Sequence, residues 1–288
     1  MANKKLNNLF SLLLLSLTFV MSTGCSDNST DDLVKRPLKT DSCPGNTENT
    51  ATGNNDVLVW ADEFNENGIP CTNNWTYDIG NSGWGNNEIQ YYKKDDSDNV
   101  IIADGVLKIT AVKELYKGSN YTSTRMKTQG LFSFTYGKVE VRAKLPDGGG
   151  TWPAIWMLGD NFPSAGWPAC GEIDIMEHVG NRPGWPSSAI HNPAGYAATY
   201  FGEEQYIANV TSEFHVYGVI WSQEKIEFTV DGVEHFTYNP AVKNTNNWPF
   251  SANQFIILNV AMGGNLGGNI PSNFTKSTME IDYVRVYQ

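Results

Sequence analysis

The chain has 288 residues and a formal net charge of −11, a length that suits one large all-β domain or two smaller domains. An acidic protein repels the phosphate groups of nucleic acids and the sulfate groups of charged polysaccharides, so we expect no nucleic acid partner and favour a neutral polymer. The composition includes 13 Tyr, 13 Phe, 9 Trp and 27 Gly. This mixture favours short strands joined by turns, with aromatic rings left over for a surface that stacks on sugars or bases.

Residues 1–24 have the features of an export signal. Lys4 and Lys5 precede an apolar run over residues 9–20, which is too short to cross a bilayer comfortably. Small residues at 22–24 then lead into Cys25, a pattern that resembles a bacterial lipoprotein processing site; an ordinary cleaved signal peptide is the alternative. We predict an exported protein that is attached to the outer membrane through a lipid on Cys25, exposed on the cell surface and without other membrane contacts.

Residues 25–55 predict a flexible surface tether, because they are rich in Ser, Thr, Asn, Asp, Gly and Pro and have little apolar content. Within it, the acidic, polar stretch 26–32 resembles the tether of surface-exported Bacteroidetes lipoproteins. An exported protein can form disulfides. With Cys25 lipidated, we expect Cys43 to pair with Cys71. Cys170 would then stay free as a small buried hydrophobic residue.

Residues 56–288 predict a single domain built from many short strands, with no internal repeat and no long helical pattern. The alternation of polar and apolar residues over 137–144 is typical of a strand with one buried face. Asp104-Gly105 and Asp231-Gly232 are strong signals for hairpin turns. We therefore expect an all-β fold, a two-sheet antiparallel β-sandwich. The predicted strands are 57–60, 100–102, 107–112, 137–144, 155–158, 172–177, 215–221, 225–230, 255–260 and 279–287.

Three acids lie close together in the predicted strand GEIDIMEHVG at 171–180. In a plain strand Glu172 and Asp174 share one face and Glu177 points to the other. One extra residue, accommodated as a β-bulge after Asp174, returns Glu177 to the face of the other two. The carboxyl groups of Glu172 and Glu177 would then approach to about 5–6 Å, near the spacing of a retaining glycosidase. Asp174 would hydrogen-bond Glu172, and repulsion among the carboxylates would raise one pKa, as a general acid requires.

Alternating acids often form only a solvated outer face, so the flanking residues decide between the two interpretations. Ile173 and Ile175 supply an apolar opposite face. Trp152, Trp156 and Trp167 crowd the same stretch of sequence, and indole rings pack well against the C–H face of a pyranose. Acids and rings together favour a site that binds and cleaves sugars.

The segment GEIDIMEHVG is similar to the catalytic signature of glycoside hydrolase family 16 in its bulged form, E-x-D-x-x-E. The resemblance to laminarinase-type members extends over about residues 57–288 and is carried by the segments 86–92, 126–146, 148–159, 214–232, 257–265 and 279–288. It implies a jelly-roll sandwich with a concave substrate groove and a retaining double displacement. By motif position, Glu172 matches the nucleophile, Asp174 its supporting acid and Glu177 the acid/base.

The resemblance also implies substrate-binding residues along the groove. Trp152 and Trp156 match aromatic residues on the glycone side, and Trp167 lies where another is expected. Asn87 and Arg125 match groups that bind sugar hydroxyls in distal subsites. A histidine near the leaving group corresponds to His191, which equally fits a structural histidine.

A structural calcium ion far from the groove is a further implied feature, whereas no cofactor is expected for catalysis. The matching positions are Glu63, the carbonyl of Gly105 and Asp282. Hard oxygen ligands of this kind suit calcium. Glu63 and Asp282 equally fit ordinary surface acids.

We therefore predict a monomeric endo-β-1,3-glucanase that acts on laminarin-type glucans and also on mixed β-1,3/1,4-glucans. A galactan hydrolase of the same family, such as an agarase, is one alternative, although the acidic charge argues against a sulfated substrate. A non-catalytic glycan-binding lipoprotein is another, and the presence of all three acids argues against it. The extent of transglycosylation stays open.

Overall fold

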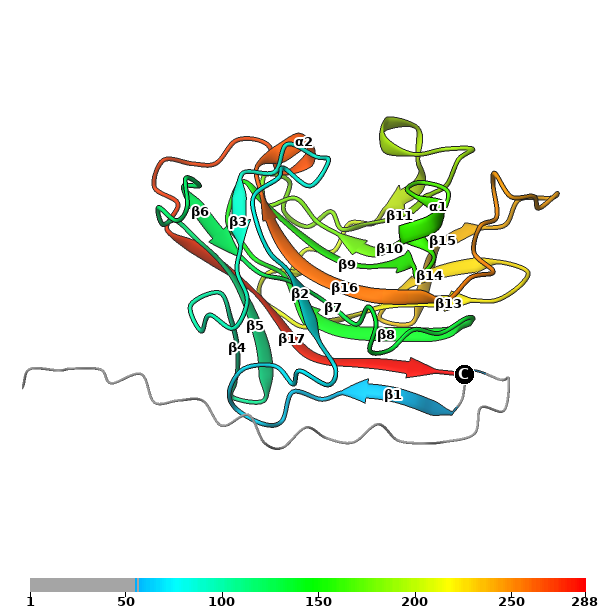
Figure 1. Cartoon of the computed structure of the whole chain (residues 1–288), viewed down its shortest axis with the longest axis horizontal. Coiled ribbons are helices and arrows are strands. Elements are labelled where there is room, and N and C mark those ends of the chain that lie inside the picture. Colours follow the sequence, from blue (N-terminus) through cyan, green and yellow to red (C-terminus); the bar gives the residue numbers. More distant parts are fainter. Residues whose placement is uncertain (1–54, 56) are drawn as a thin grey trace, which may run out of the picture. The chain divides into compact units, whose positions relative to one another are not determined.

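The structure is a computed structural model that describes residues 55 and 57–288. These residues form two β-sheets packed face to face, with two short helices and one 3₁₀ turn in the connections (Figure 1). The all-β sandwich predicted from the sequence is thereby confirmed. The predicted signal segment and tether, with Cys25 and Cys43, lie outside the described residues. No helix in the described part is long and apolar enough to cross a membrane.

Ten strands of the described chain form the first sheet, and seven form the second. In spatial order the first sheet contains β15 (Val233–Tyr238), β14 (Ile226–Val230), β13 (His215–Trp221), β8 (Gly137–Lys144), β17 (Lys276–Tyr287), β5 (Val106–Val112), β6 (Tyr121–Ser123) and β3 (Gln90–Tyr92), while β1 (Leu58–Asp62) pairs with β17 and β4 (Val100–Ala103) with β5. The second sheet contains β12 (Phe201–Glu204), β11 (Ser187–His191), β10 (Glu172–Glu177), β9 (Thr151–Gly159), β16 (Gln254–Met262), β7 (Arg125–Lys127) and β2 (Thr76–Asp78). The pairings are antiparallel except for β3 with β6.

The core lies between the two sheets and follows the alternation of each strand. In β8, Val139, Val141 and Ala143 are buried, whereas the residues between them are partly exposed. The second sheet contributes buried residues such as Ile173 and Ile256 from its inner face to the same hydrophobic cluster. Complete burial of such a side chain contributes about 1.5–3 kcal/mol, so the core fixes which face of each strand points outward.

Two tight hairpins confirm the turn predictions. β4 and β5 are joined by Asp104 and Gly105, with φ of 59° and 76°, and β14 and β15 are joined by Asp231 and Gly232, with φ of 52° and 76°. Positive φ at both central residues is the type I′ geometry that matches the twist of a hairpin. These turns set the register of the outer strands.

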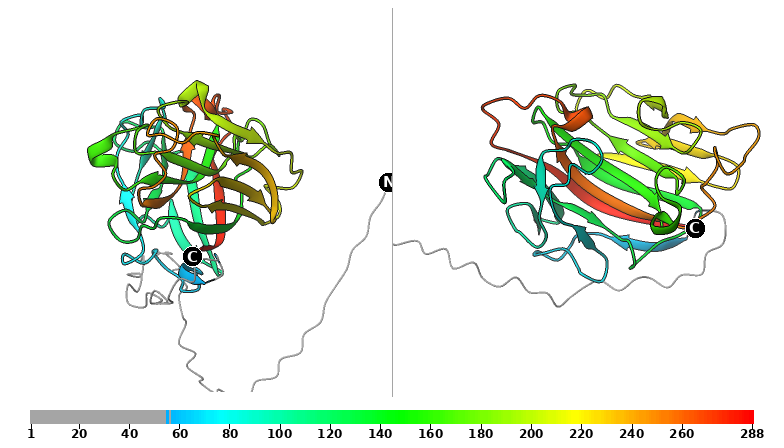
Figure 2. Two further views of the ribbon diagram at one scale, coloured as in Figure 1. Left: turned by 90° about the vertical axis from the view of Figure 1, so that its right-hand side faces the viewer. Right: turned by 45° about the horizontal axis from the view of Figure 1, so that its top comes forward.

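The outward face of the second sheet carries the candidate site. Figure 1 shows β9 and β16 as long bent strands, with the segments that contain α1 (Phe162–Ala165) and α2 (Gly264–Gly267) rising at opposite ends of this face. The two layers are seen again in the turned views of Figure 2. Side chains that point away from the core on this sheet therefore line a surface bordered by loops. We call it the groove face, after the substrate groove that the sequence resemblance implies.

The described cysteines differ in state. Cys71 is disulfide-bonded, while its expected partner Cys43 lies outside the described residues. Cys170 is free and buried, as predicted. Burial raises the pKa of its thiol to about 11, so Cys170 is an inert hydrophobic residue at neutral pH.

Candidate active site

The β-bulge predicted in β10 is present, whereas the predicted spacing of the carboxyl groups and the Asp174–Glu172 hydrogen bond stay predictions. Along β9, Asp174 pairs with Trp156 and Met176 pairs with the next residue of β9, so Ile175 is the extra residue. The register against β11 also shifts between Asp174 and Glu177. Ile175 and Met176 are both buried in the core. The bulge therefore returns Glu177 to the outward face of the sheet.

Each glutamate of β10 accepts a hydrogen bond from an indole. Trp167 Nε1 donates to Glu172 Oε2 over 3.0 Å, and Trp152 Nε1 donates to Glu177 Oε1 over 2.9 Å. Charge-assisted bonds of this kind stabilise the carboxylate form and fix its rotamer. Two of the three tryptophans expected from the sequence thus contact the acids directly.

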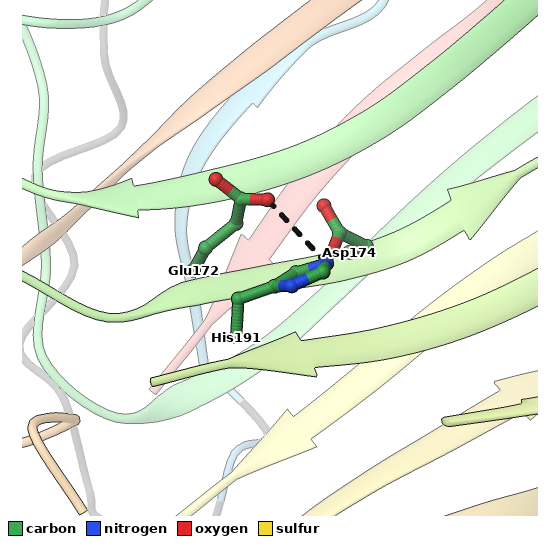
Figure 3. Close-up of side chains that lie close together, drawn as sticks. All are labelled: Glu172, Asp174 and His191. Atoms are coloured by element: carbon green, nitrogen blue, oxygen red, sulfur yellow. Dashed lines mark ion pairs between the residues drawn. The ribbon is translucent and has the colours of Figure 1, made fainter. Parts of the chain in front are cut away.

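His191 lies opposite Glu172 on β11 and faces the acids (Figure 3). Its Nε2 is 3.2 Å from Asp174 Oδ2 and 3.7 Å from Glu172 Oε1. The backbone N–H of Ala197 donates to Nδ1 over 3.2 Å, so in the neutral ring Nε2 carries the hydrogen. The imidazole therefore directs an N–H toward the two acids, which makes His191 part of the site and not a remote structural histidine.

Burial raises the pKa of all three acids. For Glu172 the pKa rises to about 8, with the Asp174 carboxylate adding to the effect and His191 opposing it. Burial and then the Glu177 carboxylate raise the pKa of Asp174 well above its ordinary range. For Glu177, burial raises the pKa while Trp152 and His191 oppose the rise. The three shifts have the same direction and favour a proton held among the acids, which belongs to the group as a whole.

Trp156 and Arg125 form a rigid stack on the side of the site toward β7. The guanidinium carbon of Arg125 lies 4.6 Å from the ring centroid of Trp156 and 5.2 Å from that of Trp84. Arg125 Nε is 2.9 Å from Asp78 Oδ2 in β2. Arg125 thus supports the indole of Trp156 as a cation over its face, while its predicted contact with sugar hydroxyls stays a prediction.

A hydrogen-bond chain holds the other edge of the same indole. Trp156 Nε1 donates to Asn259 Oδ1 over 2.8 Å, and Asn259 Nδ2 donates to the Tyr92 hydroxyl over 3.2 Å. The Tyr92 hydroxyl donates in turn to Glu88 Oε2 over 3.1 Å. Such a connected network fixes the ring in one orientation.

Asn87 lies farther out, in the turn before β3. Its Nδ2 donates to Asn265 Oδ1 in α2 over 2.8 Å. The side chain ties two loops together at the end of the groove face, and the structure does not place it against the acids of β10. Its predicted role in a distal subsite stays a prediction.

Sequence reasoning missed two tyrosines beside His191. The His191 ring is 5.6 Å from that of Tyr200, and Trp167 is 5.3 Å from Tyr196. The tyrosines flank the short turn η1 (Ala197–Thr199), each 45% exposed. The sequence signal that could have identified them is a pair of tyrosines five and nine residues after the candidate histidine His191. Trp84 and Asn259 were missed as well, since only long-range contacts bring Trp84 to Arg125 and Asn259 to Trp156.

The residues proposed for calcium are engaged by arginines. Both carboxylate oxygens of Glu63 accept hydrogen bonds from Arg285, at 2.7 and 2.8 Å. Asp282 Oδ2 accepts one from Arg142 over 2.5 Å. Calcium takes six to eight oxygen ligands, and in this arrangement the arginines engage both oxygens of Glu63 and one oxygen of Asp282. Gly105 lies in the β4–β5 turn, and calcium binding stays a prediction.

One cluster in the described chain has the donor atoms of a metal site, namely Glu172, Asp174 and His191, whose atoms lie within 4.8 Å of one another. Glu172 and His191 also contact the exposed ring of Trp167. A pair of glutamates on one face of a strand, each held by an indole N–H and accompanied by a third acid, is suited to cleaving a glycosidic bond. The fold and the site define a glycoside hydrolase.

The model of the glycosyl hydrolases family 16 matches residues 86–285, so the chain belongs to this family. The Beta-glucanase of Rhodothermus marinus is 42% identical over 243 residues, which cover 80% of this chain and 85% of that protein. The Glucan endo-1,3-beta-glucosidase of Cryptopygus antarcticus is 37% identical over 249 residues, covering 80% and 91%. The structure of the laminarinase from Rhodothermus marinus superposes with a TM-score of 0.77 at 42% identity, covering 80% of this chain and 96% of that one.

Proposed function

We propose that the protein is a retaining endo-β-1,3-glucanase that hydrolyses laminarin-type glucans and mixed β-1,3/1,4-glucans. The observation that carries the proposal is the bulge in β10, which presents Glu172, Asp174 and Glu177 on one face beside Trp152 and Trp167. Relatives named as a beta-glucanase and an endo-1,3-beta-glucosidase, each at least 37% identical, support the substrate class.

In the first step, a carboxylate oxygen of Glu172 attacks the anomeric carbon, and Glu177 donates its proton to the departing glycosidic oxygen. The leaving glucan departs and a covalent glycosyl–Glu172 ester remains. In the second step, Glu177 takes a proton from water, whose oxygen attacks the same carbon and frees Glu172. Two inversions leave the anomeric configuration unchanged.

Asp174 and His191 would assist Glu172. Burial and the Glu177 carboxylate raise the pKa of Asp174, which favours its protonated form, and a protonated Asp174 carboxyl would donate a hydrogen bond to Glu172. The N–H of His191, 3.7 Å from Glu172 Oε1, favours the negative charge that returns to Glu172 when the ester is hydrolysed. Both residues would therefore help Glu172 to leave in the second step.

The roles of the two glutamates can be separated by azide rescue of the Glu172→Ala and Glu177→Ala variants on an activated aryl β-laminaribioside. Both variants should lose about 10²–10⁴-fold or more of the activity on laminarin. Azide should convert the Glu177→Ala glycosyl-enzyme into a β-glycosyl azide, and should attack directly in Glu172→Ala to give the α-azide. The opposite products, identified by NMR, would exchange the two roles.

The substrate class is tested with the wild-type protein on laminarin, lichenan, cellulose and agarose in parallel. We expect oligosaccharide ladders from laminarin, an early fall in the viscosity of lichenan, and almost no product from cellulose. Activity on agarose with none on laminarin would replace this proposal by the galactan alternative.

A further inference from the structure

The groove face continues beyond the acids onto β11 and β12. Glu177 pairs with Ser187 of β11, and Ser187 pairs with Glu204 of β12. Directly paired residues of antiparallel strands point to the same face, so Glu204 lies on the outward face with Glu177. Two strand spacings, or about 9.5 Å, separate the two positions across the sheet.

Glu204 begins a second cluster, which the catalytic mechanism does not use. It forms an ion pair with Arg182 from the β10–β11 connection. The guanidinium carbon of Arg182 lies 4.7 Å from the ring centroid of Trp185. The ring of Trp185 is in turn 5.2 Å from that of Tyr206, at an interplanar angle of 50°. Trp185 is 37% exposed and Tyr206 is 61% exposed, so both rings are open to a ligand.

Backbone hydrogen bonds join the two segments that carry these rings. Ile207 N–H donates to the carbonyl of Gly184 over 2.8 Å, and Gln205 N–H donates to that of Pro186 over 2.9 Å. Gly184 has a φ of 83°, and a Cβ there would approach the Tyr206 ring to 3.0 Å, so glycine permits both the turn and the close approach. A preorganised pair of rings loses little conformational entropy on binding.

Tyr200 joins this cluster to the catalytic acids. A Cβ on Gly202 of β12 would meet the Tyr200 ring at 2.7 Å, so the ring lies over that glycine on the way from His191 to β12. After burial, the carboxylates of Glu177 and Glu204 raise the pKa of the Tyr200 hydroxyl, which is consistent with its position between them. Strand pairing, the ion pair of Glu204 and the ring contacts of Trp185 thus link Glu177 to Tyr206 across the outward face.

We infer that Trp185 and Tyr206, with Arg182, form an outer sugar-binding subsite for a long β-glucan. The cluster adjoins Glu177, which protonates the leaving group in the proposed mechanism, so the subsite is assigned to the reducing-end side. The inference rests on the proposed function. Exposed rings suit the C–H faces of glucosyl residues, while the paired guanidinium and carboxylate groups offer donors and acceptors to the sugar hydroxyls. Continuity with the groove favours the substrate chain as the occupant over an unrelated protein.

The test compares Trp185→Ala with wild type on two substrates, laminarin and an aryl β-laminaribioside whose leaving group ends beside the acids. Trp185→Ala should lower kcat/KM on laminarin roughly tenfold, as truncation of a well-placed aromatic anchor commonly does, and leave kcat/KM on the aryl glycoside unchanged. Trp185→Tyr, which retains a ring, should recover most of the loss. Tyr283→Ala is the matched control, because Arg285 covers that ring at 3.8 Å on the first sheet, and it should affect neither substrate.

A second readout follows the bonds cleaved in laminarihexaose labelled at its reducing end. Loss of the outer subsite should move cleavage toward the reducing end, which a general loss of stability would not do. Unchanged kinetics and cleavage pattern in Trp185→Ala would overturn the subsite while leaving the glucanase proposal intact. Equal losses on both substrates would also overturn it, as a structural effect. A wild-type protein without activity on laminarin would refute the proposed function and this subsite together.

Discussion

Replacing Trp152 by Phe should move one limb of the pH–activity profile and leave the other in place. Burial raises the pKa of Glu177, and the 2.9 Å hydrogen bond from Trp152 opposes that rise. Phe retains an aromatic ring for the sugar but has no N–H donor. The pKa of Glu177 in the variant should therefore rise further, because its carboxylate form has lost a stabilising bond.

The magnitude follows from the strength of that bond. A hydrogen bond to a charged group contributes about 1.5 kcal/mol at the low end of its usual range, and one pKa unit corresponds to about 1.4 kcal/mol. The pKa of Glu177 should rise by about one unit. In the proposed mechanism Glu177 is the general acid and must be protonated in the free enzyme, so the alkaline limb of kcat/KM should move to higher pH by the same amount.

Two companion variants make the assay specific. Trp167→Phe removes the 3.0 Å bond to Glu172 and should move the acid limb upward, by less because Trp167 is 42% exposed. Trp156→Phe removes a bond to the neutral amide of Asn259, so it should change KM without moving either limb. The profiles are measured on a soluble aryl β-laminaribioside. A shift of the acid limb in Trp152→Phe, or equal shifts in all three variants, would refute the reasoning.

Two further predictions concern stability and location. His178 is buried, neither ring nitrogen has a hydrogen-bond partner in the described chain, and burial lowers its pKa from 6.5 to about 4. Because the unfolded chain binds the proton first as pH falls, the free energy of unfolding should decrease by about 3 kcal/mol between pH 6.5 and about 4. Urea titrations of His178→Phe should lack that decrease. We also propose that Cys25 carries a lipid anchor, so Cys25→Ala should move the protein from the membrane fraction to the soluble fraction, and unchanged fractionation would argue for another form of attachment.

The strands that the sequence predicted are those whose own residues decide their conformation. β8 alternates strictly and buries every second residue, and the type I′ turns need only two residues. β11 and β12 were missed because Ser-Ser-Ala-Ile-His and Phe-Gly-Glu-Glu are short and polar. Their pairing with β10 and with each other, not intrinsic propensity, makes them strands.

The candidate site likewise contains features that the sequence predicts and features that only the structure reveals. The bulge in β10 was predictable because the chemistry requires Glu172 and Glu177 on one face, whereas a plain strand would separate them. The partners of Trp156 were not predictable, because Arg125 and Asn259 reach it only through neighbouring strands of the sheet. One sequence does not reveal which strands are neighbours, so contacts between distant segments require the structure.

The bulge also changes what a loss of one codon would do to this strand. In an ordinary strand, such a deletion turns every later side chain to the opposite face. Here Ile175 is already the supernumerary residue, so its removal would restore an even pleat with Glu172, Asp174 and Glu177 still on the outward side. Met176 and His178 would keep their inward orientation. The three acids therefore share one face with or without Ile175, so this strand tolerates the loss of that one residue without separating Glu172 from Glu177.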